Sequence, residues 1–230
     1  FPVLEILEAD DLRPLMAVID RLDEFHLAIF ISPNAVHKAM NLIRARRDFP
    51  RGLKVAAIGK SSAKVLGEFG VAEVIAPAKR MDSEALLELP EMNEVAGKRV
   101  VIFRGDGGRE LLGDTLVARG ATLEYAECYR RGRPAVDATP LLKSWARNRL
   151  DAITVTSSEG LRNLYDMVGK LGQQWLKKTP LFVPHERIAQ TARELGLVRV
   201  ILTAPGDAGL VEGLARWFAE PDSEHTRNSG

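Results

Sequence analysis

The stretch VVIFRGDGGRELL (residues 100–112) decides the fold class, because it joins two patterns that belong to different elements. The apolar run at 100–103 is typical of a strand buried on both faces, and the run from 110 onward is typical of a helix. The turn between them matches neither the G-x-x-x-x-G-K-[ST] phosphate loop nor the G-x-G-x-x-G dinucleotide turn. Its glycines therefore predict a tight turn with close backbone approach to a ligand, and its arginines favour carboxylates.

The same alternation of strand-like and helical runs continues along the chain, which predicts an α/β protein with a parallel sheet. The predicted strands lie at residues 27–32, 53–59, 71–77, 98–105, 151–157, 179–184 and 198–205. The predicted helices lie at residues 61–69, 110–119, 159–171 and 188–195. Several are expected to end at a capping glycine, namely Gly70, Gly120, Gly172 and Gly196.

An internal repeat predicts two similar domains of the flavodoxin-like or Rossmann-like parallel-sheet type. FISPNAVHKAM (30–40) aligns with TVTSSEGLRNL (154–164), and residues 54–77 align with residues 180–205. The unit at residues 97–131 has no partner in the second half, so we expect the matching strand and helix to lie before Phe1. Ligands of open α/β sheets bind beyond the carboxyl ends of the strands, so two such domains predict a cleft between them.

The expected domain boundaries follow from this repeat. They are residues 7–127 for an inserted domain, residues 1–6 and 128–132 for a two-stranded hinge, residues 133–218 for the other domain, and residues 219–230 for a disordered tail.

Composition narrows the class of partner. Lys and Arg total 32 and Asp and Glu total 31, so the net charge of +1 argues against a nucleic-acid or membrane-surface binder. No apolar run approaches the roughly 18 residues that span a bilayer. The lone Cys128 cannot form an intrachain disulfide, which suits a reducing cytoplasm. The four histidines are scattered, so no metal site is expected.

Hydroxyls, glycines and cations gather in the loops that follow the predicted strands, where helix N-termini favour anions. The candidate ligand-binding residues are Ser32, Asn34, Lys60, Ser61, Ser62, Arg104, Gly107, Arg109, Ser157, Ser158, His185 and Arg187. Two structural alternatives stay open. Ser32, Ser61 and Ser157 are also suitable helix N-caps, and Arg104 and Arg109 are also suitable for exposed salt bridges.

Tyr129 is the candidate catalytic residue. It lies in the predicted hinge beside Arg130 and Arg131, where a phenol can donate a proton into the cleft. The alternative is an aromatic side chain that only packs between the domains.

Together these loops resemble the uroporphyrinogen-III synthase family over nearly the whole chain. The similar segments are FISPNAV (30–36), VAAIGKSSAKVLGEFG (55–70), RGDGGRELLGDTLVARGA (104–121), CYRR (128–131) and ITVTSSEGLRNL (153–164). The chain departs from the family pattern in two places. The family's first strand and helix are absent before Phe1, and HER at 185–187 replaces the Gly-x-Thr-type turn of many relatives, so hydroxyl contacts are not carried over to that loop.

The resemblance implies a cytoplasmic, cofactor-free lyase of tetrapyrrole biosynthesis. Such an enzyme cyclises hydroxymethylbilane, which carries eight carboxylates, to uroporphyrinogen III with loss of water and inversion of ring D. It also implies that Tyr129 assists departure of the hydroxyl, and that the protein is a monomer in transient contact with hydroxymethylbilane synthase.

Two other functions remain open at this stage. One is a non-catalytic two-domain protein that binds a small polyacidic ligand. The other is a silent synthase-like domain fused to a regulator.

Overall fold

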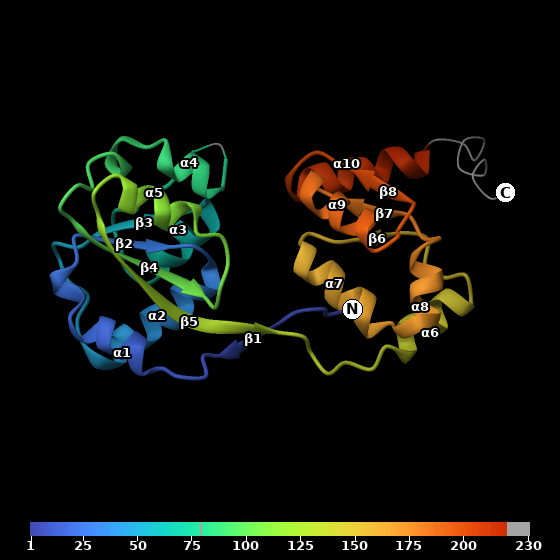
Figure 1. Cartoon of the computed structure of the whole chain (residues 1–230), viewed down its shortest axis with the longest axis horizontal. Coiled ribbons are helices and arrows are strands. Elements are labelled where there is room, and N and C mark those ends of the chain that lie inside the picture. Colours follow the sequence, from blue (N-terminus) through green and yellow to red (C-terminus); the bar gives the residue numbers. More distant parts are fainter. Residues whose placement is uncertain (79, 220–230) are drawn as a thin grey trace. The chain divides into compact units, whose positions relative to one another are not determined.

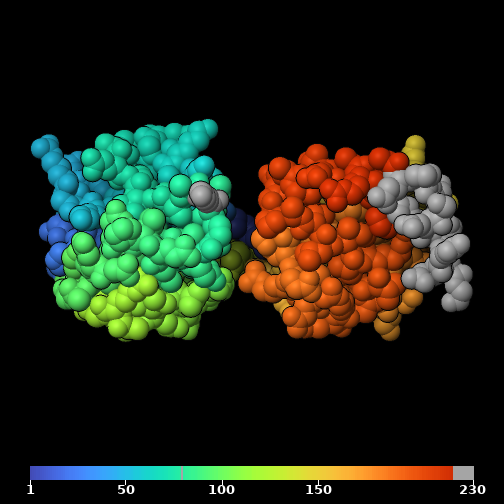
Figure 2. Space-filling view, turned by 90° about the horizontal axis from the view of Figure 1, so that it is seen from above, coloured from blue at the N-terminus to red at the C-terminus, as the bar shows by residue number. Residues whose placement is uncertain are grey.

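A computed structural model describes residues 1–78 and 80–219, which divide into two compact units. Unit 1 consists of Phe1–Glu5 together with the chain from Arg133 onward, and unit 2 is Ile6–Gly132. The chain therefore passes from one unit to the other after Glu5 and after Gly132 (Figure 1). Figure 2 shows each unit as a rounded body of its own, blue to yellow-green for unit 2 and orange to red for most of unit 1.

Unit 2 is built around a five-stranded sheet with the order β1-β5-β4-β2-β3. Its strands are β1 (Glu5–Glu8), β2 (Leu27–Phe30), β3 (Lys54–Ala57), β4 (Arg99–Gly105) and β5 (Thr122–Gly132). The pairs β2–β3, β2–β4 and β4–β5 are parallel. All four residues of β2 are buried, because helices cover both faces of the sheet.

The helices of unit 2 divide between the two faces of this sheet. They are α1 (Arg13–Asp20), α2 (Pro33–Arg46), α3 (Lys60–Glu68), α4 (Ser83–Leu87) and α5 (Leu111–Ala118), with short 3-10 helices η1 (Leu22–Glu24) and η2 (Pro90–Met92). One core cluster joins α1, α2 and α3 to the sheet, and the other joins α4 and α5 to it. In the first cluster the rings of Phe30 and Phe103 stack with their centroids 4.7 Å apart.

Unit 1 has a three-stranded parallel sheet, β6-β7-β8, in the described part of the chain. Its strands are β6 (Ile153–Thr154), β7 (Leu181–Val183) and β8 (Val200–Leu202), and its helices are α6 (Thr139–Ala146), α7 (Ser158–Met167), α8 (Gly169–Leu176), α9 (Glu186–Glu194) and α10 (Gly206–Ala219). The N-terminal segment belongs to this unit, since Asn163 Nδ2 donates to the carbonyl oxygen of Val3 at 2.9 Å.

The α/β class with a mostly parallel sheet is confirmed, but two element predictions are wrong. The strand expected at 71–77 is reduced to one bridge between Ile75 and Ala56, since Pro77 has no amide hydrogen to extend the ladder. The helix expected at 159–171 is two helices, α7 and α8, interrupted at Gly169, whose φ is 62°.

The expected capping glycines are confirmed in three cases of four. Gly70, Gly120 and Gly196 follow helix ends with φ of 80°, 91° and 75°. Gly172 does not end a helix. It lies inside α8, where an added Cβ would come within 2.4 Å of Val168 Cβ, so close packing explains this glycine.

Two expectations concern segments outside the domains. Residues 128–132, expected as part of a hinge, are the end of β5, which runs without a break from Thr122 to Gly132. Of the expected tail at 219–230, Ala219 is the last residue of α10, and the remainder lies outside the described residues.

Candidate functional site

Tyr129 owes its direction to an irregularity in β5. In the register with β4, Arg104 opposes Glu127 and Gly105 opposes Tyr129, so Cys128 is an extra residue and forms a β-bulge. Regular alternation would place Cys128 and Tyr129 on opposite faces, yet both lie in the core cluster with α1 and α2. The bulge therefore aims the Tyr129 ring.

Gly105 makes room for that ring. A Cβ added at Gly105 would lie 2.5 Å from the Tyr129 ring, closer than any contact that carbon atoms tolerate. Asp106 then fixes the neighbouring backbone. Its N–H donates to the Tyr129 carbonyl oxygen at 2.8 Å, and its carboxylate accepts from the Arg131 N–H at 2.9 Å.

Ser32 joins the tyrosine hydroxyl to the start of α2. Its Oγ accepts a hydrogen bond from the Ala35 N–H at 3.1 Å and lies 3.1 Å from the Tyr129 hydroxyl. Either hydroxyl can donate in the Ser32–Tyr129 pair, because Ser32 Oγ keeps a second lone pair while it accepts from the backbone. When Ser32 donates, the Tyr129 proton is available to another acceptor. Tyr129 is only 4% exposed, because it packs in the core cluster of unit 2.

Arg104, near the end of β4, and Arg109, in the loop that follows, have different surroundings. Arg109 is 53% exposed and its Nη2 lies 2.6 Å from Glu84 Oε1, which is the exposed salt bridge of the structural alternative. This hydrogen bond lowers the pKa of Glu84 below its ordinary value. Arg104 is buried at 5% exposure and its guanidinium lies over the ring of Tyr125, 4.5 Å from the centroid. Gly107 and Gly108 have φ of 58° and 110°, so the loop needs glycine at both positions.

The remaining candidates of unit 2 differ in exposure. Asn34, Lys60 and Ser61 are exposed, whereas Ser62 is only 2% exposed. Ser61 is not an N-cap, since Gly59 holds that position at the start of α3.

Unit 1 brings its four candidates to the carboxyl ends of β6 and β7. Ser157 caps α7 by accepting from the Gly160 N–H at 3.0 Å, in the position that Ser32 has in unit 2. The Ser158 hydroxyl lies 3.5 Å from the carbonyl oxygen of Arg187, so the two loops are adjacent. The side chains of His185 and Arg187 are exposed.

Sequence reasoning missed three features of these loops. The packing of Gly105 on Tyr129 and the role of Asp106 depend on β5, more than twenty residues away, and no local pattern signals them. In unit 1 a third loop, residues 203–206, follows β8 and leads into α10. Its TAPG sequence is a recognisable turn signal.

A pocket of about 340 Å³ on unit 2 also borders Tyr129. Its charged lining residues are Asp10, Asp11, Asp106, Glu127 and Arg130. The one cation, Arg130, is paired with Asp10 at 2.8 Å. This acidic lining repels carboxylates, so a polyacidic ligand is expected at the Ser32 and 104–110 loops instead.

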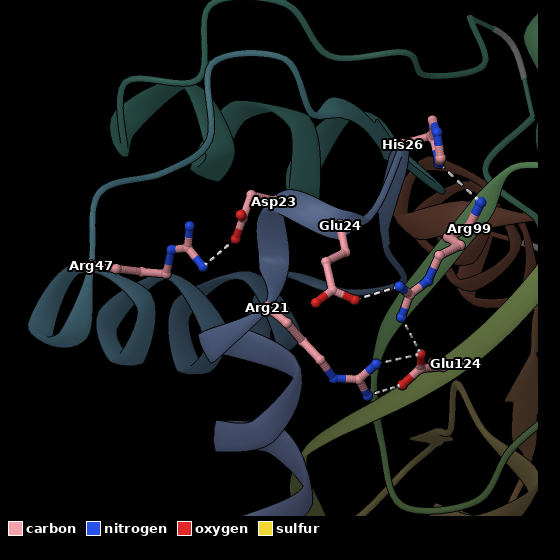
Figure 3. Close-up of polar contacts among 7 residues, drawn as sticks. All are labelled: Arg21, Asp23, Glu24, His26, Arg47, Arg99 and Glu124. Atoms are coloured by element: carbon pink, nitrogen blue, oxygen red, sulfur yellow. Dashed lines mark hydrogen bonds and ion pairs between the residues drawn. The ribbon is translucent and has the colours of Figure 1, made fainter.

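The opposite, amino end of the same sheet carries a network of paired charges (Figure 3). Glu124 accepts from Arg21 at 3.0 and 2.5 Å and from Arg99 at 3.2 Å, and Arg99 also bonds Glu24. The hydrogen bond from Arg21 is the main cause that lowers the pKa of Glu124, against the opposing effect of burial.

Other site types receive no support from the described residues. Residues 1–78 and 80–219 contain no group of three or more His, Cys, Asp or Glu side chains placed to hold a metal ion. No helix in the same ranges is long and apolar enough to cross a bilayer. Burial raises the pKa of the Cys128 thiol to about 12, so this cysteine is a poor nucleophile.

The chain is similar to known proteins over most of its length. A family model described as "Uroporphyrinogen-III synthase HemD" matches residues 1–212. The uroporphyrinogen-III synthases of Escherichia coli K12 and Salmonella typhimurium LT2 are 36% and 37% identical over 212 residues, which are 90% of this chain and 86% of either relative.

Two solved structures share the fold. A mutant uroporphyrinogen III synthase from Thermus thermophilus aligns with a TM-score of 0.62 at 16% identity, over 95% of this chain and 88% of that one. The enzyme from Helicobacter pylori aligns with a TM-score of 0.61 at 15% identity, over 94% and 91%.

Proposed function

The chain belongs to the uroporphyrinogen-III synthase family, and we propose that it cyclises hydroxymethylbilane to uroporphyrinogen III with loss of water and inversion of ring D. The enzyme is a cyclising lyase of tetrapyrrole biosynthesis. The observation that carries the mechanism is the Tyr129 hydroxyl, held 3.1 Å from Ser32 at the carboxyl end of the sheet.

Tyr129 acts as the general acid in this proposal. It donates its proton to the hydroxyl on ring A, the C–O bond breaks, and water leaves as the lone pair of the pyrrole nitrogen forms an azafulvenium cation, which keeps its N–H proton. The hydroxyl of Ser32 stabilises the phenolate that results. Ring D then attacks through its substituted carbon to give a spiro intermediate, which fragments and closes again with ring D inverted. The proton lost from ring D in the final closure restores Tyr129.

Orientation carries the choice of isomer. Hydroxymethylbilane closes without inversion in solution, so the protein must hold the chain curled while the spiro intermediate forms. We propose that loops of both units contact the carboxylates of the substrate. The contacting residues would be Ser32, Asn34, Lys60, Ser61, Ser62, Arg104, Gly107 and Arg109 from unit 2, and Ser157, Ser158, His185 and Arg187 from unit 1.

The direct test is the identity of the product. Purified protein would be incubated with freshly prepared hydroxymethylbilane, and the oxidised products would be resolved by chromatography. Isomer III is expected in large excess, formed faster than in a control without protein. Isomer I alone, at the spontaneous rate, would sink the proposal and favour a non-catalytic protein that binds a polyacidic ligand.

Three further parts of the proposal concern the setting of the enzyme. They are a monomeric state, a transient contact with hydroxymethylbilane synthase and a cytoplasmic location. Size-exclusion chromatography with light scattering, alone and with the synthase added, checks the first two.

A further inference from the structure

Arg104 is a buried cation near the carboxyl end of the central strand β4, one residue before the loop that follows it. It is 5% exposed, and its Nε donates to the Gly105 carbonyl oxygen at 3.2 Å. One face of its guanidinium lies over Tyr125. Its Nη2 reaches the loop itself, since a Cβ added at Gly108 would lie 3.5 Å from that nitrogen.

No carboxylate among the described residues lies within salt-bridge distance of Arg104. Arg99, on the same strand, is a partly exposed arginine with which Arg104 can be compared. Its guanidinium also lies over an aromatic ring, 5.0 Å from the Phe25 centroid, but it is paired with both Glu24 and Glu124. Arg99 thus forms ion pairs with two glutamates, whereas Arg104 forms none with the described residues.

Burying a guanidinium away from its counter-ion is costly, so the absence of one needs a reason. The loop supplies unused donors beside the charge. Within the described chain, the backbone N–H groups of Gly107 and Gly108 donate to no protein acceptor. Their positive φ values exclude most side chains from this stretch, which leaves the backbone open to a ligand.

We propose that Arg104, with the N–H groups of Gly107 and Gly108, forms the binding site for one carboxylate of the substrate. The inference rests on the proposed function and deepens it, because it assigns one anchoring point among several possible cations. A planar guanidinium and two amide hydrogens match the two oxygens of a carboxylate. The missing counter-ion is then supplied by the ligand.

The test compares matched variants at the two ends of β4. In Arg104→Met the KM for hydroxymethylbilane is expected to rise about tenfold to a hundredfold, while the melting temperature stays equal or increases. Arg104→Lys keeps the charge and is expected to recover part of this loss. Arg99→Met is the control, with a lower melting temperature and an unchanged KM.

Two results of these kinetic measurements would count against the proposed site. Equal rises of KM in Arg104→Lys and Arg104→Met would overturn the proposal, as would an Arg104→Met enzyme with normal KM. If Arg104→Met does not fold, the proposed site is tested instead by hydrogen exchange of the wild-type protein. Uroporphyrinogen III, kept from oxidation, is expected to slow hydrogen exchange of the Gly107 and Gly108 amides. Unchanged exchange rates would overturn the proposed site. Production of isomer III by the wild type tests the proposed function separately.

Discussion

The central strand β4 carries an arginine near each end, and the two arginines differ in their charged neighbours. At the amino end Arg99 lies in a network with Glu24 and Glu124 (Figure 3). At the carboxyl end Arg104 has no acid partner among the described residues. The charges at the amino end are therefore paired within unit 2, and we expect this network to stabilise the unit. The carboxyl end leaves a cation without an acid partner, beside backbone N–H groups that donate to no protein acceptor, as expected where open α/β sheets bind ligands.

The largest effect is expected from a substitution at the carboxyl end that fills the space beside Tyr129. Gly105→Ala would place a methyl group 2.5 Å from the ring. We expect a loss of about 1–3 kcal/mol in the free energy of unfolding, typical of overpacking, and a fall of kcat of about a hundredfold because the hydroxyl is misplaced. Denaturant titration and steady-state kinetics measure the two effects.

Gly67→Ala is the matched control for this substitution. Gly67 is in α3 and a Cβ added there would meet nothing within 4 Å, so the variant should gain about 0.5–1 kcal/mol with normal kcat. A normal kcat for Gly105→Ala would mean that the position of the ring does not matter.

Removing only the hydroxyl of Tyr129 tests whether this residue acts as the general acid. Tyr129→Phe keeps the packed ring, so kcat is expected to fall about tenfold to a hundredfold, near the low end for a general acid, with little change in KM. The share of isomer III should fall as well, because spontaneous closure then competes. Full kcat with isomer III alone would exclude Tyr129 as the acid.

The amino end is tested by Glu124→Gln, which removes the negative charge that Arg21 and Arg99 share and one of the two acceptor oxygens. We expect a loss of about 1–2 kcal/mol in the free energy of unfolding at pH 7, with kcat and KM unchanged. A change in KM would contradict the separation of the two ends.

The same residue predicts a pH dependence. The folded-state pKa of Glu124 is lowered below 4.5, chiefly by the hydrogen bond from Arg21. Its stabilising effect is therefore complete above the unfolded-state pKa and is lost as pH falls through the folded-state pKa. Urea titrations from pH 7 down to pH 3 should show the wild type and Glu124→Gln converging, and a constant difference would contradict this.

The smallest effect is expected where the carboxyl end does have an ion pair. Glu84→Gln frees Arg109 from an exposed salt bridge worth about 0.2–1 kcal/mol, so stability should change by no more than that. If Arg109 leaves Glu84 to bind substrate, the variant should lower KM by about twofold to fivefold, since the competing carboxylate is gone. An unchanged KM would mean that Arg109 stays with Glu84.

Much of this organisation could be predicted from the sequence, because it depends on local patterns. The buried run at β2 and the glycines that follow α3, α5 and α9 each depend on residues close in the chain. The caps at Ser32 and Ser157 are equally local, since each hydroxyl bonds an amide three residues ahead. The sequence alone thus determined the α/β class, most elements, the loops that carry polar residues and, through resemblance, the family.

Only the tertiary structure decided how those loops work. The bulge at Cys128 is a choice of register between two strands, and it directs Tyr129 towards Ser32 and Gly105. The roles of Arg104 and Arg109 were equivalent in the sequence and differ in space, because Glu84 reaches only Arg109 from α4. Register and ion pairing join residues about 25 to 100 positions apart, and a local pattern carries no information about such distant partners.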